Sequence, residues 1–393
     1  MAKVSTKLKA TIDPKKLKRL FKIGGGILVL LVGFYFIATA DFFPIVAMGD
    51  SGTATSTPPA HQLDKAAYDQ KLLQIAKVPT STWAAYLTAT TSNPAISLPS
   101  VGLGILTTLA TSTRKSITNA LWPVQNLPYP NYGALLPQNR IVAYYGNFYS
   151  TGMGILGQNP PDVMIPQLEA TVAQWQAADP STPVIPAIDY IVITAQGSPG
   201  KDGMYRARMP EAQVDKALEL AKEVNGIVIL DVQVGLSNLQ TELPQYENYF
   251  KMPNVELAID PEFAMHNGQK PGDYIGSYSS SDVNFAANYL ANLVKEYNLP
   301  PKILVVHRFT GPMVTGYQNI KPLPEVQIVM DMDGWGSASK KIGTYNAFIQ
   351  SQPVQFTGFK LFYKNDLKPP STAMMTPAQV LSLTPAPLFI QYQ

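Results

Sequence analysis

The sequence contains no cysteine, and only three of its 393 residues are histidines. Without cysteine the chain cannot form a disulfide, a thiolate zinc site or a lipidated cysteine anchor. Histidines at positions 61, 266 and 307 are too few for a zinc site with several histidine ligands. Charged residues are also scarce, at 15% against 46% hydrophobic residues, so the chain can bury one large core or two modest ones.

Acidic residues are nearly missing from the first 40 positions, which hold eight lysines and arginines but only Asp13 as an acid. The rest of the chain has 22 basic and 26 acidic residues, a net charge of −4. The overall charge of +3 therefore comes from the N-terminal tail, and the body shows no basic excess of the kind that binds nucleic acid. We expect no nucleic-acid partner.

An uncharged apolar run covers residues 23–40, and a second apolar stretch continues it over 42–48. Its length is near the lower limit for a bilayer-spanning helix, and the basic tail before it predicts a cytoplasmic N-terminus. The alternative is a signal peptide cleaved after Ala40, because Ala38 and Ala40 have the small-residue spacing of a cleavage site. The long basic region and the apolar continuation favour a retained single-pass anchor. Both alternatives place the body outside the cytoplasm.

The composition divides the chain into five segments. A Ser/Thr/Pro-rich stretch between the apolar run and the body is typical of a linker that holds a domain away from a membrane. The predicted segments are a basic cytoplasmic tail (1–22), a transmembrane anchor or signal segment (23–47), a linker (48–62), a helical and irregular extension (63–139) and the main domain (140–393).

From Arg140 onward, apolar runs of strand length alternate with helical patterns. The eight predicted strands cover residues 140–147, 184–193, 227–234, 254–260, 302–309, 326–333, 356–363 and 388–393. The predicted helices cover residues 161–178, 209–224, 281–297, 337–351 and 376–383, while the connections 238–250 and 311–320 are irregular.

This alternation predicts an α/β protein with a parallel (β/α)₈ barrel over residues 140–393. A doubly wound open sheet is the alternative fold. It is disfavoured because the chain has eight strands and no glycine-rich phosphate-binding turn.

The segment Val255–Phe263, with sequence VELAIDPEF, shows how a strand of this domain ends. Apolar residues alternate with small or polar ones, and Pro261 ends the strand because it cannot donate to a sheet ladder. Asp260 and Glu262 fall on the polar parity on either side of it. Two acids at the inward-facing end of a strand make a poor core, which indicates a site.

Active sites of such barrels lie at the carboxyl ends of the strands. The residues that the parity places at those ends are Tyr144 or Tyr145 with Asn147, Asp231 with Gln233, Asp260 with Glu262, His307, Asp331 with Asp333, Lys360 and Gln391. Asp189 has a less clear parity. The five carboxylates would repel one another, so we expect some to be protonated, paired with His307 or Lys360, or bound to a cation.

Paired carboxylates, one protonated and one ionised, are the equipment for glycoside hydrolysis. Aromatic residues that suit sugar stacking lie at or near the same strand ends: Tyr144, Tyr145, Phe148, Tyr149, Trp335, Phe362 and Tyr363. The chain thus resembles barrel-type glycoside hydrolases. Asp260-Pro261-Glu262 is similar to the end of the chitinase-type motif, in which the glutamate is the acid, and the aspartates of 330–333 are faintly similar to the strand 6 segment of that family. Val255 and Ala258 stand where that family has further aspartates.

The resemblance implies a carbohydrate substrate, with Glu262 as general acid and Asp260 or Asp331 as its partner. His307, Lys360 and Gln233 would orient groups, and no cofactor is needed. In the loop after the second strand, Arg206 and Arg208 have the parity to hold one anionic substituent together.

Two other functions fit the same residues. A metal-dependent hydrolase or phosphodiesterase would use the carboxylates as hard oxygen ligands for magnesium, calcium or manganese, with His307 as ligand or base. A non-catalytic surface barrel would only bind a glycan or a protein partner.

Overall fold

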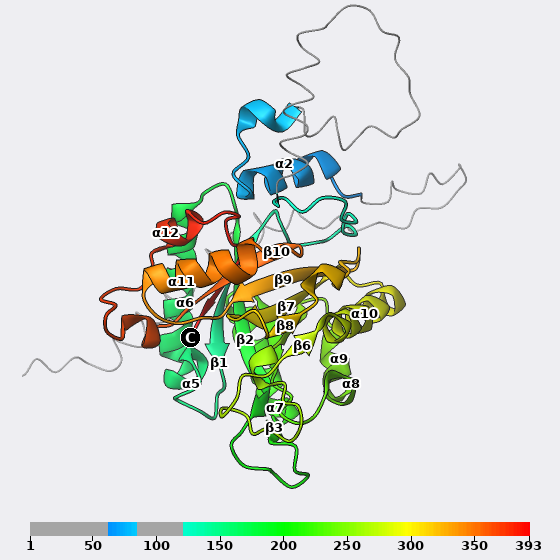
Figure 1. The fold of residues 1–393 in the computed structure, drawn as a ribbon, viewed down its shortest axis with the longest axis vertical. Coiled ribbons are helices and arrows are strands. Elements are labelled where there is room, and N and C mark those ends of the chain that lie inside the picture. The colour runs from blue at the N-terminus through cyan, green and yellow to red at the C-terminus, as the bar shows by residue number, and fades with distance from the viewer. Residues whose placement is uncertain (1–61, 85–120) are drawn as a thin grey trace, which may run out of the picture. The chain divides into compact units, whose positions relative to one another are not determined.

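The computed structural model describes residues 62–84 and 121–393 (Figure 1). The predicted tail, the anchor or signal segment 23–47 and nearly all of the linker lie outside these residues, as do residues 85–120. Within the described ranges no helix is long and apolar enough to cross a membrane.

Eight parallel strands close into a barrel, which confirms the predicted fold of residues 140–393. The strands are β1 (Arg140–Gly146), β2 (Val184–Ala195), β4 (Ile227–Val232), β5 (Val255–Ile259), β7 (Lys302–Arg308), β9 (Val326–Met332), β10 (Phe356–Leu361) and β11 (Phe389–Tyr392). Each pairs with the next in this order, and β1 closes the ring by pairing with both β2 and β11. The three remaining short strands are β3 (Arg206–Arg208), antiparallel to β2, and the parallel pair β6 (Tyr278–Ser279) and β8 (Val314–Thr315).

Helices cover the outside of the barrel. They are α5 (Ile155–Gln158), α6 (Pro161–Ala178), α7 (Glu211–Glu223), α8 (Leu239–Glu242), α9 (Glu247–Phe250), α10 (Ser280–Tyr297), α11 (Ala338–Tyr345) and α12 (Pro377–Leu381). Short single turns complete the connections: η1 (Thr80–Thr82), η2 (Leu243–Tyr246), η3 (Pro261–Phe263), η4 (Tyr317–Asn319), η5 (Asn346–Gln350) and η6 (Asn365–Leu367). The connections predicted to be irregular contain only such short pieces.

Local sequence signals explain where α10, one of two 18-residue helices in the described part of the chain, begins and ends. Ser279 and Asp282 form a reciprocal capping box at the start of α10. Asn298 adopts the left-handed conformation directly after its last turn. The predicted helix 281–297 is therefore confirmed to within one residue.

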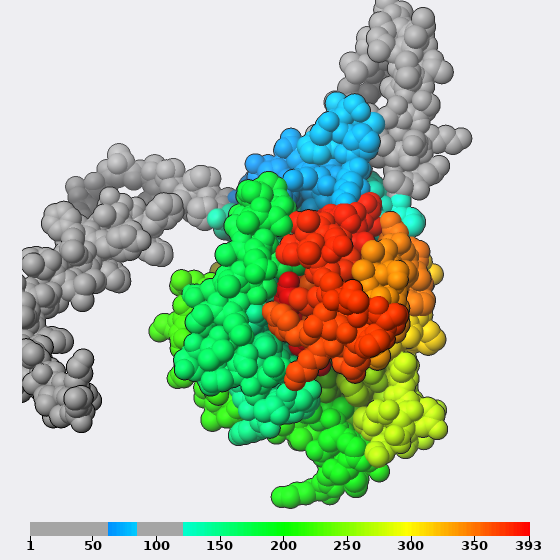
Figure 2. Space-filling view, turned by 90° about the vertical axis from the view of Figure 1, so that its left-hand side faces the viewer, coloured from blue at the N-terminus to red at the C-terminus, as the bar shows by residue number. Residues whose placement is uncertain are grey.

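The ring closes where the last strand meets the first, and the surrounding helices close with it. Figure 2 shows the red C-terminal segment directly against the green segment that contains α6. Inside this seam the indole of Trp175 on α6 donates a hydrogen bond to the hydroxyl of Tyr392 on β11 at 2.9 Å. Both side chains are buried, so the indole N–H finds its partner within the core.

The barrel has two apolar clusters, one between strands and helices and one inside the ring. Helix α2 (Lys65–Ile75) contributes Tyr68 and Ile75 to the inner cluster. The Lys71 ammonium of α2 donates to Thr182 Oγ1 at 2.6 Å, and the Ala386 amide donates to the Ile75 carbonyl at 2.8 Å. Thr182 and Ala386 lie just before the first residues of β2 and β11. Helix α2 therefore covers the N-terminal end of the barrel (Figure 1). The opposite end is left for the site.

Candidate active site

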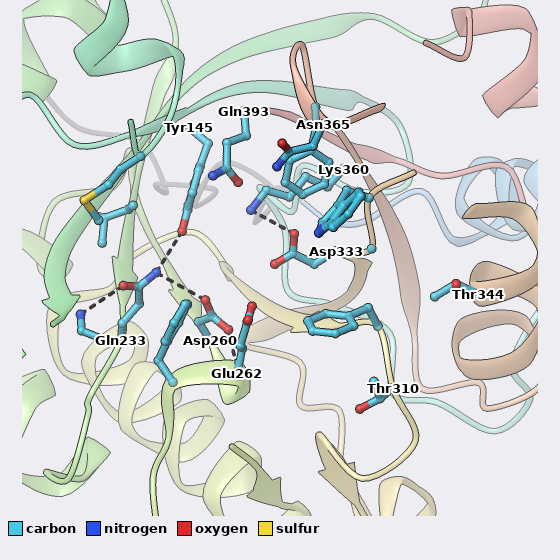
Figure 3. A pocket seen from close by; sticks show the side chains of 18 of the residues that line it. Tyr145, Gln233, Asp260, Glu262, Thr310, Asp333, Thr344, Lys360, Asn365 and Gln393 are labelled. Carbon is cyan, nitrogen blue, oxygen red and sulfur yellow. Dashed lines mark hydrogen bonds and ion pairs between the residues drawn. The ribbon is translucent and has the colours of Figure 1, made fainter. Parts of the chain in front are cut away.

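A cavity of about 560 Å³ opens at the carboxyl ends of the barrel strands. Six ionisable or amide residues of its lining come from five strands and the residues directly after them: Tyr145, Gln233, Asp260, Glu262, Asp333 and Lys360 (Figure 3). Its aromatic lining includes Phe263, Phe309, Trp335 and Phe362. Charged groups surrounded by apolar rings suit a ligand that has both hydroxyl groups and apolar faces.

The Asp-Pro-Glu sequence positions two of the acids. Strand β5 ends at Ile259, and Asp260 then caps the short turn η3, whose first residue is Pro261. The Asp260 Oδ1 atom accepts a hydrogen bond from the Glu262 amide at 2.9 Å. Because the turn is fixed in this way, Glu262 stands beside Asp260 at the cavity wall.

A third acid reaches the same place from β9, which is separated from β5 by the single strand β7. Asp333 follows β9, and its Oδ1 atom lies 3.0 Å from the Lys360 ammonium at the end of β10. That ammonium also lies 3.8 Å from the centre of the Tyr145 ring. One oxygen each of Asp260, Glu262 and Asp333 lie within 4.8 Å of one another.

Gln233 connects the two sides of the cavity floor. Its amide nitrogen donates to the Tyr145 hydroxyl at 3.2 Å and to Asp260 Oδ2 at 3.4 Å, while its oxygen accepts from the Ala195 amide at 3.1 Å (Figure 3). The side chain is buried, and these bonds hold it in one orientation. Gln233 is therefore placed to orient both Asp260 and Tyr145.

The environment separates the protonation states of Glu262 and Asp333. Burial, reinforced by the nearby charge of Asp333, raises the pKa of Glu262 from its ordinary 4.5 to about 7. Burial also acts to raise the pKa of Asp333, but Lys360 and His307 outweigh it and hold that pKa below its ordinary value. Near neutral pH Glu262 can thus carry a proton while Asp333 stays ionised.

His307 and its neighbours form a buried polar layer beneath the cavity. The His307 Nε2 atom hydrogen-bonds Asp231 Oδ2 at 2.8 Å, and its Nδ1 atom lies 3.4 Å from Asp331 Oδ2 and 3.3 Å from Asp333 Oδ2. These last two contacts are close ion pairs without hydrogen-bond direction. Burial acts to lower the pKa of His307, but the three aspartates outweigh it and raise that pKa well above its ordinary value. The imidazolium therefore stabilises the acids around it.

Burial favours the protonated form of the remaining acids around this layer. Burial is the main reason why the pKa of Asp260 and that of Asp189 lie well above the ordinary value, and it also raises the pKa of Asp331. Asp189 accepts a hydrogen bond from the Gln391 amide at 2.5 Å. We expected some of the carboxylates to be protonated, paired with His307 or Lys360, or bound to a cation; the contacts of Asp231 with His307 and of Asp333 with Lys360 are such pairs.

Gly358 on β10 makes room for this layer. A Cβ atom at this position would overlap Asp331 Oδ1 and lie 3.0 Å from a ring carbon of Phe389. Neither neighbour can move far, because both are buried inside the ring. A glycine is therefore required opposite Asp331.

The residues predicted from strand parity fall into three groups. Tyr145, Gln233, Asp260, Glu262, Asp333, Trp335 and Lys360 line the cavity. Asp231, His307, Asp331 and Gln391 lie fully buried and outside the cavity lining. Tyr144, Asn147, Arg206, Arg208 and Tyr363 lie elsewhere.

Tyr144 and Tyr363 are not at the cavity. Strand parity turns Tyr144 outward, where its hydroxyl bonds Thr171 on α6 at 2.8 Å and Tyr363 at 2.9 Å. Of the two tyrosines left open by the sequence, Tyr145 is the one that faces inward. Asn147 is also turned away, because its amide donates to the Ile191 carbonyl at 2.9 Å.

Arg206 and Arg208 do hold one anionic group together, but it belongs to the protein. The buried Glu242 carboxylate lies 2.8 Å from Arg206 Nε and 2.7 Å from Arg208 Nε. Neither arginine lines the cavity, and their charges are already compensated. The prediction that they contact a substrate is therefore corrected: they fix the strand β3 to α8.

Parity missed the lining residues that lie beyond the strands. Lys340 lies on α11, Asn365 lies in η6, and Thr310 and Met153 lie in loops, where a period of two no longer applies. Gln393 continues the parity of Gln391 and could have been found. The others depend on how each connection folds back over the mouth.

The three cavity acids also have the chemistry of a divalent-cation site. Asp260, Glu262 and Asp333 offer hard oxygen atoms at mutual distances that one ion can bridge. The Lys360 ammonium, 3.0 Å from Asp333, occupies one side of that space and competes with a cation. The three acids can therefore hold a cation, but a cation bound to Asp333 would have to compete with the Lys360 ammonium.

No protein-family model and no curated protein matches the sequence. Among solved structures the chain is similar to a ruminal GH26 endo-β-1,4-mannanase, with a TM-score of 0.32 and 13% identity over 65% of this chain and 58% of the mannanase. It is also similar to a GH5-4 broad specificity endoglucanase from an uncultured bovine rumen ciliate, with a TM-score of 0.30 and 12% identity over 63% of this chain and 85% of that one.

A noncanonic maltogenic α-amylase, AmyB from Thermotoga neapolitana, matches at a TM-score of 0.23 and 13% identity, over 55% of this chain and 49% of the amylase. The chain spans less than two thirds of the mannanase. TM-scores this low carry no argument about superfamily or activity.

Proposed function

We propose that this barrel hydrolyses glycosidic bonds, with Glu262 as general acid and Asp333 as its ionised partner. The observation that carries the proposal is the opposite shift in pKa of two carboxyls with oxygens within 4.8 Å of each other. Asp260 and Asp331, the partners favoured by the sequence, are less suited because burial raises the pKa of both, whereas Lys360 and His307 lower that of Asp333. The aromatic lining of the cavity supports a carbohydrate substrate.

The short separation favours a retaining mechanism, since inverting enzymes leave about 6.5–9.5 Å between their carboxyls for a water molecule. Glu262 donates its proton to the glycosidic oxygen as the bond to the anomeric carbon breaks. The Asp333 carboxylate forms a glycosyl ester at that carbon. Glu262, now ionised, then takes a proton from water, whose oxygen attacks the anomeric carbon and releases Asp333.

The remaining cavity residues keep the acids in these states. Lys360 holds Asp333 ionised through their contact at 3.0 Å, and Tyr145 packs beneath the ammonium. Gln233 fixes Asp260, which in turn fixes the turn that carries Glu262. We propose that Lys360 and Gln233 are positioning residues for the two reacting carboxyls.

A panel of polysaccharides and oligosaccharides tests the proposal. Hydrolysis of at least one substrate should fall by several orders of magnitude in Glu262→Gln and in Asp333→Asn. Glu296→Gln, which removes an exposed carboxyl on α10, is the matched control and should keep wild-type activity. Activity retained in Glu262→Gln would reject the assignment. Glycan binding without any turnover would instead identify a non-catalytic binding barrel.

A divalent-metal-dependent hydrolase or phosphodiesterase is the second candidate, favoured by the mutual approach of the Asp260, Glu262 and Asp333 oxygens. A bound ion stabilises the fold by mass action, so magnesium, calcium or manganese should raise the melting temperature and EDTA should reverse the change. Asp260→Asn should abolish that response. Hydrolysis that is insensitive to EDTA excludes the metal mechanism.

We propose further that the enzyme is held at the outer face of a membrane by residues 23–47, which lie outside the described part of the chain. The support is the basic prefix followed by an uncharged run in the sequence. The full chain should remain in membranes washed with alkaline carbonate, and protease added to intact cells should digest its barrel. Recovery of a soluble protein that starts after Ala40 would favour the cleaved signal peptide.

A further inference from the structure

The segment 334–370 carries an unusual share of the positive charge of the body. It contains five lysines, at positions 340, 341, 360, 364 and 368, and Asp366 is its single acid. The remainder of residues 41–393 then holds 17 basic and 25 acidic residues. The segment that contains β10 is therefore net basic, whereas the rest of the body is net acidic. The orange surface facing the viewer in Figure 2 is formed by this segment.

Two of these lysines are already committed to buried partners. Lys360 contacts Asp333 inside the cavity, and the buried Lys341 donates to Asp366 at 2.6 Å. Lys340, Lys364 and Lys368 are exposed. Within the described part of the chain, none of these three has a carboxylate within 4.0 Å.

Trp335 gathers two of the exposed ammonium groups at the mouth of the cavity. Its ring lies 4.7 Å from Lys340 Nζ and 5.1 Å from Lys368 Nζ, and 45% of its surface is exposed. Both Trp335 and Lys340 line the cavity that contains Glu262 and Asp333.

Contact with an aromatic face positions an ammonium group without neutralising its charge. An exposed cation–π contact is also weak, so the lysines can turn from the ring to an incoming anion at small cost. Inside the cavity the Lys360 ammonium is already paired with Asp333, whereas Lys340 and Lys368 have no carboxylate partner among the described residues. An anionic group is therefore attracted to the rim made by Trp335, Lys340 and Lys368.

We infer that Trp335, Lys340 and Lys368 form a subsite for an anionic substituent of the substrate, so that the preferred substrate is an acidic glycan. This inference rests on the proposed glycoside hydrolysis for the reaction, but the binding step can be measured separately. The substituent is a carboxylate, sulfate or phosphate, since each carries the charge and the acceptor oxygens that two ammonium groups recognise.

The test compares matched neutral and acidic oligosaccharides: a neutral hexasaccharide, a uronic-acid hexasaccharide, and sulfated and phosphorylated counterparts. For wild type, kcat/KM should be higher on at least one acidic member, and the preference should shrink as the salt concentration rises. In Lys340→Met/Lys368→Met the acidic-to-neutral ratio of kcat/KM should fall roughly 5- to 30-fold, through KM.

A matched control removes the same charge elsewhere. Lys65 lies 4.9 Å from the Tyr129 ring and Lys251 lies 4.9 Å from the Tyr297 ring, and neither lysine lines the cavity. Lys65→Met/Lys251→Met should keep the wild-type ratio. An equal fall in this variant would assign the effect to net charge and overturn the subsite.

Binding to Glu262→Gln, measured by isothermal titration calorimetry, separates the two proposals. If acidic glycans bind through the two lysines but nothing is hydrolysed by wild type, the subsite stands and the hydrolase proposal fails. If glycans are hydrolysed with no acidic preference, or with a ratio unchanged by the double substitution, the hydrolase stands and the subsite fails. If no member of the panel binds, both fail.

Discussion

Glu262→Gln should abolish hydrolysis and at the same time stabilise the fold above neutral pH. Burial and the charge of Asp333 raise the pKa of Glu262 from 4.5 to about 7, so the folded state disfavours the ionised form. Glutamine has nearly the same shape and stays neutral. The substitution therefore removes the proton donor and also removes a destabilising charge.

The sign follows from proton linkage. Below pH 4.5 Glu262 is protonated in both the folded and the unfolded chain, and the two proteins should be equally stable at this site. As pH rises from 4.5 to about 7, the unfolded chain releases its proton first, so wild type loses stability that the variant keeps. Each pKa unit corresponds to about 1.4 kcal/mol, so the rise from 4.5 to about 7 gives an expected difference of about 3–4 kcal/mol above pH 7.

Thermal unfolding of both proteins between pH 4 and 8.5 measures this difference. Glu262→Gln should melt roughly 4–8 °C above wild type at pH 8 and at the same temperature near pH 4. Glu296→Gln, at an exposed position, should follow wild type at every pH. Parallel melting curves for Glu262→Gln and wild type would mean that the pKa of Glu262 is not raised and would refute the reasoning.

Three further substitutions test other parts of the site. Lys360→Met should cost about 3–5 kcal/mol in urea unfolding and lower kcat, because it leaves Asp333 buried without its partner; unchanged kcat would contradict the positioning role. Gly358→Ala should cost about 1–3 kcal/mol and reduce activity, because the added methyl group overlaps Asp331, and wild-type stability would contradict that crowding. Glu242→Gln should lower the free energy of unfolding by about 3–5 kcal/mol, because it leaves Arg206 and Arg208 without their buried partner. It should leave kcat/KM within twofold at temperatures where the protein is folded. A large rise in KM would instead indicate that the two arginines contact the substrate.

The eight strands and the main helices follow from the sequence because their signals are local. Alternating apolar residues mark each strand, and caps such as Ser279 with Asp282 mark helix ends. Parity also predicts that Asp231, His307 and Asp331 face the interior, because successive side chains of a strand point to opposite faces. Once the ring closes, these strand ends lie at the same end of the barrel, so their proximity follows from the predicted fold.

The chemical state of each group at the mouth was decided only by tertiary contacts. The sequence could not distinguish Asp260, Asp331 and Asp333 as partners of Glu262, because each is an aspartate at a strand end. Their pKa values diverge because Asp333 meets Lys360 from the neighbouring strand while the other two are buried with weaker compensation.

The same reason explains the corrections. Arg206 and Arg208 look available in the sequence, but Glu242, 34 residues beyond Arg208, neutralises them in the fold. Trp335 and Lys340 gain a role because the segment after β9 returns to the cavity. Strand pattern is a property of neighbouring residues, so the sequence alone determined the barrel and its ring of polar strand ends. Burial and charge compensation depend on residues far apart in the chain, and only the folded structure decided which carboxyl can donate a proton.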